Sequence, residues 1–224
     1  MTAFLFIFVS IIEYVGSMIA MLAIFRYPVS YYWPQMLFSA SICSVISYAM
    51  SVENDFAFAP LVQVIVWGLC IWLMFNTPLL WSMIMCVSYL TVYIVFQGGI
   101  VYLLFYFGVV PSIISKTSVT IYLIQMFCAV VCALLGYVLM RKRIGFLFVP
   151  TSREVPYKWS KNGLLLFFGS VVAFMAIGLA YIFYFNSRSD WFFVISGSSF
   201  FIVMVLLYIM KRKNQEYVKN TWEH

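Results

Sequence analysis

Long apolar segments follow one another along the whole chain, and short polar or charged stretches separate them. Arg26-Tyr27-Pro28, Glu53-Asn54-Asp55 and Asn76-Thr77-Pro78 are three of these separators. A helix rises about 1.5 Å per residue, so about 20 residues cross the hydrocarbon core of a bilayer. The pattern therefore predicts seven transmembrane helices, over residues 4–25, 33–51, 56–75, 79–107, 118–140, 163–185 and 191–210.

The fourth segment is long for a single span, and Gln97-Gly98-Gly99 lies within it. Residues 79–114 therefore leave two alternatives open: one tilted or kinked helix, or two separate elements. A split would give eight spans and would move the N-terminus to the other side of the membrane.

Charge favours seven spans. The basic loop 141–161 and the basic segment 211–213 should both be cytoplasmic, and two spans lie between them. Counting back from the loop puts Arg26 inside, and it puts the acidic turn 53–55 and the N-terminus outside. Two isolated basic residues fall outside against this rule: Lys116 and Arg188. We expect a transmembrane domain over residues 1–210, with its N-terminus outside, and a short basic cytoplasmic tail over residues 211–224.

Composition supports the same class of protein. Of the 224 residues, 65% are hydrophobic and 9% are charged, whereas a soluble domain carries about 25% charged residues. We therefore expect an all-α, multi-pass protein of the cell membrane. The net charge of +6 does not indicate nucleic-acid binding, because nine of the thirteen Lys and Arg residues lie in segments 141–161 and 211–213. Such clusters beside spans face anionic lipid, so the bilayer itself is the expected partner.

Glu13 lies near the middle of the first apolar segment. A carboxyl group at that depth costs about 2.5–3.5 kcal/mol on insertion scales, so we expect it to face the inside of the bundle. No Lys, Arg or His lies in the middle of a span, which excludes an internal ion pair. The carboxylate could accept hydrogen bonds from glutamine amides, or it could be protonated, since burial without a cation favours the neutral form.

Three glutamines also lie within apolar segments, at depths similar to that of Glu13 when counted at about 1.5 Å per residue. They are Gln63, Gln97 and Gln125. Together with Glu13 they could form one polar layer from four helices. Two interpretations remain open: hydrogen bonds that hold helices together, or a polar pocket that opens outward and binds a ligand. Small residues four apart predict close helix packing, in the pairs Ala129 with Ala133, Gly169 with Ala173, and Ala176 with Ala180.

Residues for catalysis or metal binding are scarce. The single histidine is His224, and no nucleophile–base pair or phosphate-binding loop is present. The five cysteines lie in apolar segments and are expected to behave as small hydrophobic residues. Cys128 and Cys132 share a helix face, which leaves a redox pair or metal site as the alternative. We expect a non-enzymatic protein without a metal or cofactor.

Short motifs in the first half of the chain resemble the membrane sensor region of accessory-gene-regulator-type sensor histidine kinases, the family with a GHKL ATPase domain. The motifs are Ile12-Glu13-Tyr14, Pro60-Leu61-Val62-Gln63, Phe75-Asn76-Thr77-Pro78-Leu79-Leu80-Trp81-Ser82 and the later Gln97. Members are Gram-positive bacterial receptors whose six or seven spans bind a secreted peptide and signal to a cytoplasmic kinase. This chain ends fourteen residues after Met210. The resemblance therefore implies a sensor-like module without the kinase domain, or the membrane part of a longer kinase.

The leading hypothesis is a sensor or receptor-like membrane protein. An extracellular peptide or small ligand would enter among Glu13, Gln63, Gln97 and Gln125. The tail, with Lys211, Arg212 and Lys213, would lie on the lipid surface or contact a cytoplasmic or membrane signalling partner. The alternatives are a small proton-coupled transporter or channel component that uses Glu13, and a structural partner of another membrane protein.

Overall fold

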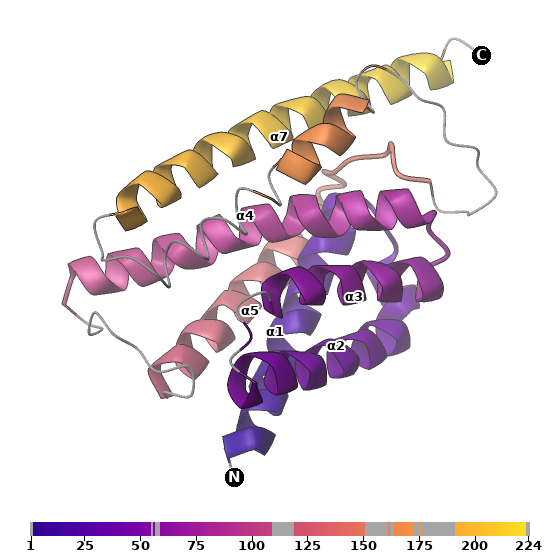
Figure 1. Ribbon diagram of the computed structural model, residues 1–224. Helices are drawn as coiled ribbons and strands as arrows, with labels where there is room; N and C mark the ends of the chain where they lie inside the picture. Colours follow the sequence, from indigo (N-terminus) through magenta and orange to yellow (C-terminus); the bar gives the residue numbers. More distant parts are fainter. Residues whose placement is uncertain are drawn as a thin grey trace.

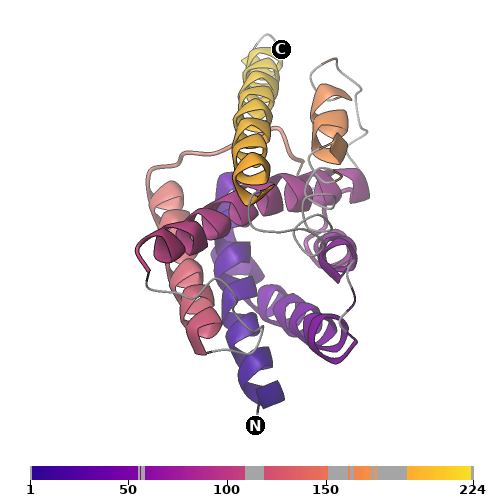
Figure 2. The ribbon, with the colours of Figure 1, turned by 60° about the vertical axis from the view of Figure 1, so that its left-hand side comes forward.

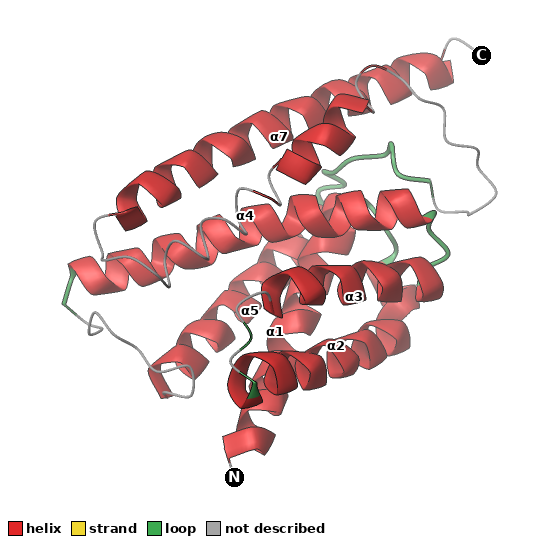
Figure 3. Ribbon diagram, viewed as in Figure 1, coloured by secondary structure: helices red, strands yellow, loops and turns green. Residues whose placement is uncertain are grey.

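The computed structural model describes residues 2–54, 56, 59–108, 119–150, 161, 164–172, 175 and 191–222. Within these ranges all regular structure is helical (Figure 3). Four helical segments are long and apolar enough to cross a membrane: Ala3–Ile24, Val29–Glu53, Leu79–Ile100 and Val119–Arg141. A shorter apolar helix covers Leu61–Met74. The prediction of a helical protein of membrane type is confirmed at this level.

Each of the first five predicted segments contains one main helix. These are α1 (Thr2–Ile24), α2 (Trp33–Tyr48), α3 (Ala59–Met74), α4 (Leu79–Tyr106) and α5 (Val119–Arg141). A 3₁₀ turn, η1 (Val29–Tyr32), precedes α2, and a π-helical turn, η2 (Ala49–Glu53), follows it. Residues 164–172 are also helical, and α7 runs from Trp191 to Trp222. Most of the sixth predicted span lies outside the described residues, as do Asp55, Lys116, Ala173, Ala176, Ala180 and Arg188.

Helix α4 is continuous through Gln97-Gly98-Gly99 and is 28 residues long. A glycine in a helix costs about 1 kcal/mol relative to alanine. Breaking the helix within an apolar layer would leave several backbone groups without hydrogen-bond partners, and each would cost more than that. The described part of residues 79–114 is therefore one helix rather than two elements.

Successive helices run in alternating directions. Between α1 and the α2 segment, Phe6 contacts Tyr48 and Tyr27 contacts Tyr32. Between α2 and α3, Ser47 contacts Gln63 and Ser39 contacts Met74. Between α1 and α5, Phe6 contacts Tyr122 and Gly16 contacts Ala129. Early residues of α1 contact late residues of the α2 segment but early residues of α5. Helix α1 is therefore antiparallel to α2 and parallel to α5, as expected for consecutive crossings of one layer.

One end of the bundle, which we call the basic end, gathers the C-termini of α1, α3 and α5 and the N-termini of α2 and α4. Aromatic side chains pack there around the segment 142–150: the Phe148 ring lies 6.1 Å from that of Phe25 and 5.5 Å from that of Trp81. The Tyr27 hydroxyl donates a hydrogen bond to the Pro150 carbonyl at 2.6 Å, and burial raises the pKa of Tyr27. The segment that follows α5 is thereby held against the end of α1.

Helix α7 reaches the same basic end. The Leu147 amide donates a hydrogen bond to Asn214 Oδ1 at 2.7 Å, and α7 is in contact with α4. The views in Figure 1 and Figure 2 show α7 over α4, with the start of α1 and the end of α7 at opposite ends of the molecule. Helix α4 crosses α1 on the way, and this crossing places the polar residues of the two helices in contact.

Candidate functional site

Glu13 is partly buried and its carboxyl group faces α4. The Tyr93 hydroxyl donates a hydrogen bond to Glu13 Oε1, and Gln97 Nε2 donates a second one to the same oxygen at 3.4 Å. Tyr93 and Gln97 are four residues apart, so they lie one above the other on the same face of α4. Two donors from one helix therefore hold an acidic side chain from another, and no lysine, arginine or histidine of the described chain takes part.

Helix α5 completes the surroundings of this carboxyl group. Tyr89 lies one turn from Tyr93, and the two rings stack with centroids 6.1 Å apart. The Tyr89 hydroxyl donates to Cys132 Sγ at 3.5 Å, and Ser17 and Cys128 lie close by. We call this set the polar cluster: Glu13, Ser17, Tyr89, Tyr93, Gln97, Cys128 and Cys132. Hydrogen bonds within this set join α1 to α4 and α4 to α5. Glu13 is its acidic member, and the other members are uncharged polar residues.

Glycines bring α1 and α5 close enough for the polar cluster to form. A Cβ atom at Gly16 would lie 2.5 Å from the Ala129 carbonyl oxygen, and one at Gly136 would lie 3.0 Å from the Ile19 carbonyl oxygen. The backbones of α1 and α5 touch at these two levels, and this requires glycine at both positions. Ala129 was predicted as a close-packing position, and its partner is Gly16 on another helix.

The structure brings together two of the four predicted ligand-binding residues. Glu13 and Gln97 are in contact, as described above. Gln63 instead donates to Ser47 Oγ at 2.9 Å and joins α3 to α2; Ser47 in turn lies near Tyr14. Gln125 is on the face of α5 that carries Tyr122 and Ala129, and its buried Oε1 atom has no hydrogen-bond partner in the described part of the chain. The expected single layer is thus a Glu13–Gln97 contact with two separate glutamines.

Two buried polar atoms without partners lie on α5. Besides Gln125 Oε1, the hydroxyl of Tyr122 has no hydrogen-bond partner among the described residues, and Tyr122 packs with Phe6 and Val9 in an apolar cluster near the start of α1. Each such atom costs about 1–3 kcal/mol compared with a satisfied one. An acceptor and a donor one turn apart on α5 are therefore available for a polar molecule.

Sequence reasoning missed the tyrosines of the polar cluster. Tyrosine is common in this chain, with sixteen copies, so its presence in an apolar segment attracts no notice. Spacing was the available signal: Tyr93 is four residues before Gln97, and a polar partner for Glu13 was already expected on that helix.

The predicted tail continues the last helix. Helix α7 passes through Met210 without a break, and Lys211 and Arg212 are exposed. Arg212 lies over the ring of Tyr208 at 5.3 Å, and Lys213 Nζ is 3.4 Å from Glu216 Oε2. The tail is therefore a helical extension. Among the described residues, no group of three or more His, Cys, Asp or Glu side chains is arranged to hold a metal ion.

The chain matches no protein-family model, no curated protein sequence and no solved structure. The resemblance to the sensor kinases therefore stays a prediction.

Proposed function

We propose that this protein is a seven-span, non-enzymatic sensor of the cell membrane, with its N-terminus outside and its C-terminus in the cytoplasm. An extracellular ligand would act on the outer half of α1 and α5, beside the polar cluster. The geometry gives two supports, one for the orientation and one for the ligand.

The orientation is supported by where the charges gather. Arg26, Arg141, Lys142 and Arg143 lie at the basic end, and Asn214 ties the basic segment of α7 to the same end. Glu53 lies at the other end of α2. Positive residues retained on one side of a membrane mark the cytoplasmic side.

The ligand is supported by the unsatisfied pair on α5, and this observation carries the proposal. Tyr122 offers a hydroxyl donor and Gln125 a carbonyl acceptor, both buried near the end of the bundle opposite the basic end. A peptide or small molecule with an amide group can bond both atoms. Its binding would give both atoms a hydrogen-bond partner and so remove the free-energy cost of burying them without one.

Binding would reach the cytoplasmic side through the polar cluster. Gln125 is one turn from Cys128, which lies close to Glu13, so a ligand that moves α5 also changes the contacts of Glu13 with Tyr93 and Gln97. A packed bundle has discrete arrangements, and a ligand that prefers one changes their populations. Helix α4 would transmit the change to α7 and its basic tail, the proposed contact for a signalling partner.

Thermal protection of the purified chain in lipid nanodiscs tests the proposal, with the peptide fraction of the native host's spent medium as the probe. We expect protection of the wild type and its loss in Gln125→Leu and Glu13→Leu. Gln35→Leu is the matched control, because Gln35 Oε1 is also buried without a partner but lies at the basic end. Wild-type protection in both Glu13→Gln and Glu13→Leu would overturn the role of Glu13.

A proton-coupled transporter or channel component is the second candidate, and one observation favours it. Glu13 bonds Tyr93, Tyr93 stacks on Tyr89, and Tyr89 bonds Cys132, so protonatable groups line up along α4. Proteoliposomes with a pH gradient and an internal pH dye separate the candidates. Flux that is lost in Glu13→Gln would support transport, and no flux in the wild type would support sensing.

A further inference from the structure

Helices α1 and α5 end in the same unusual way at the basic end. Arg26 follows α1 with φ 55°, and Arg143 follows α5 with φ 54°. The amides of Arg26 and Tyr27 bond to the carbonyls of Ala23 and Leu22, and the amides of Arg143 and Ile144 bond to those of Met140 and Leu139. These are two Schellman motifs, in which the left-handed position is normally glycine.

Arginine in a left-handed conformation costs about 1 kcal/mol or more relative to glycine, because its Cβ atom crowds the backbone. A helix can end in a Schellman motif without this cost, because glycine adopts the left-handed conformation freely. A cation near a helix C-terminus is favourable, but α5 already carries Arg141 in its last turn and Lys142 directly after it. The helix dipole therefore does not account for the left-handed arginine after α5, which indicates a role for the Arg143 side chain. Helix α1 has no basic residue in its last turn, so Arg26 also balances the dipole of that helix.

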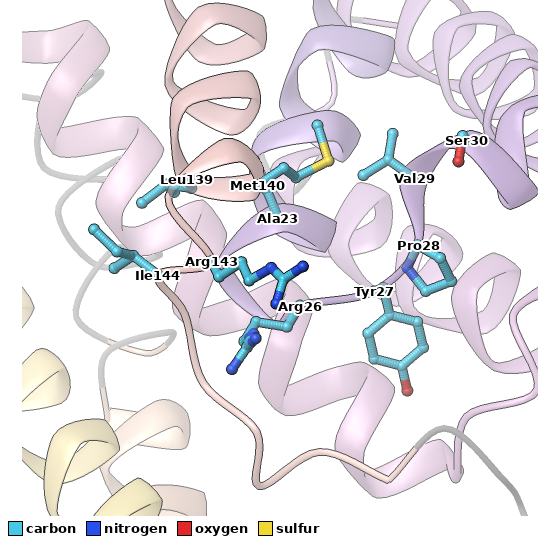
Figure 4. A pocket seen from close by; sticks show the side chains of 10 residues that line it. All are labelled: Ala23, Arg26, Tyr27, Pro28, Val29, Ser30, Leu139, Met140, Arg143 and Ile144. Carbon is cyan, nitrogen blue, oxygen red and sulfur yellow. The ribbon is translucent and has the colours of Figure 1, made fainter.

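The segment after α5 brings the two arginines together. The Phe146 amide donates to the Ile24 carbonyl at 2.7 Å. A Cβ atom at Gly145 would lie 2.6 Å from that same oxygen and 2.7 Å from Arg26 Cγ, so only glycine allows this approach. Both arginine side chains then lie over one hollow (Figure 4).

The hollow has the size and lining of a site for an amphiphilic anion. Its volume is about 500 Å³, within the range of about 300–1,000 Å³ typical of ligand sites. Ala23, Val29, Leu139 and Met140 give it an apolar floor, and no acidic residue of the described part of the chain lines it. Neither arginine side chain forms an ion pair or hydrogen bond with another residue of the described ranges. Two arginine side chains that line one hollow, and that pair with no acidic residue of the described ranges, favour the binding of an anion there.

We propose that the hollow between Arg26 and Arg143 binds the phosphate group of an anionic lipid headgroup. Guanidinium groups recognise phosphate oxygens with two parallel hydrogen bonds, and basic pockets between transmembrane helices on the cytoplasmic side suit such headgroups. The hollow lies where α1 and α5 leave the apolar layer, which is the depth of a headgroup. Its apolar floor would contact the glycerol and first acyl carbons.

Binding of phosphatidylglycerol to the full chain in maltoside detergent, which carries no phosphate, tests this site. Native mass spectrometry counts retained lipid, and thermal unfolding reports stabilisation. We expect Arg26→Gly and Arg143→Gly to weaken retention at least about tenfold each, since a hydrogen bond to a charged group is lost. Both variants should fold at least as stably as the wild type without lipid, because glycine relieves the left-handed backbone.

Lys142→Gln is the matched control, because Lys142 is in the same turn, is exposed, and does not line the hollow. It should retain the lipid like the wild type. Equal retention in the arginine variants, or an equal loss in Lys142→Gln, would overturn the site. A second arm adds inorganic phosphate to the chain without lipid. If phosphate stabilises the chain and phosphatidylglycerol does not displace it, the assignment of the site to a lipid headgroup is overturned. The hollow is far from the polar cluster, so either outcome leaves the proposed sensor function to its own test.

Discussion

Replacing Gly16 by alanine should destabilise the bundle although alanine is the better helix former. The new Cβ atom would lie 2.5 Å from the Ala129 carbonyl oxygen and 3.0 Å from Ala129 Cα, and both are backbone atoms that no rotamer change can move. Helices α1 and α5 must therefore separate by at least about half an ångström at this level. Forcing atoms into packed contacts costs about 1–3 kcal/mol, against a gain of about 1 kcal/mol in helix propensity. We expect a net loss of up to about 2 kcal/mol.

Gly98→Ala on α4 provides the matched control. Apart from its own helix backbone, no atom of the described residues would lie within 4 Å of a Cβ atom at Gly98, so only the gain in helix propensity applies, and stability should rise by about 0.5–1 kcal/mol. Unfolding of both variants in mixed micelles with increasing dodecyl sulfate, followed by tryptophan fluorescence, gives the two free energies. Opposite signs are expected. Similar effects of the two substitutions would refute the close approach of α1 to α5, and with it the position of α5 beside Glu13.

Two further substitutions test one contact in the polar cluster and one at the basic end. Tyr93→Phe removes one of the two donors to Glu13 and should lower the free energy of unfolding by about 1–2 kcal/mol, near the upper limit for membrane helices. Tyr137→Phe, at an exposed position of α5, should change it by less than about 0.5 kcal/mol, and equal effects would contradict the contact. Asn214→Ala removes the acceptor of the Leu147 amide, so hydrogen exchange at Leu147 should accelerate while α7 stays helical; unchanged exchange would show that α7 does not hold the segment after α5.

Much of the helix arrangement follows from the sequence, but helix faces do not. Apolar length and turn residues located α1 to α5 within a few residues, because in an apolar layer a chain must satisfy its backbone groups within a helix. Charge placed Arg26 with the segment after α5, and both are at the basic end. These helices are apolar on nearly all sides, so periodicity does not show which side faces which neighbour. That is why Gln63 was grouped with Glu13 by depth, whereas it faces Ser47 on α2.

The features that sequence reasoning missed depend on pairs from distant segments. Nothing in the first apolar segment shows that Gly16 lies against Ala129, or that Tyr93 donates to Glu13. The left-handed conformation of the two arginines could not be predicted from the sequence, for a similar reason. A helix end predicts glycine at that position, and a departure from this rule appears only when the backbone is known.

The contact between the Glu13 carboxyl group and the Tyr93 hydroxyl is the centre of the proposed function, and solid-state NMR measures it directly. The chain is prepared in lipid bilayers with ¹³C at glutamate Cδ and tyrosine Cζ, and Tyr93→Phe assigns the signal. We expect a dipolar cross-peak between Glu13 Cδ and Tyr93 Cζ, and little broadening of the Glu13 signal by a nitroxide on the lipid chains. No cross-peak, together with strong broadening by the nitroxide, would place the carboxyl group against lipid and contradict the sensor site.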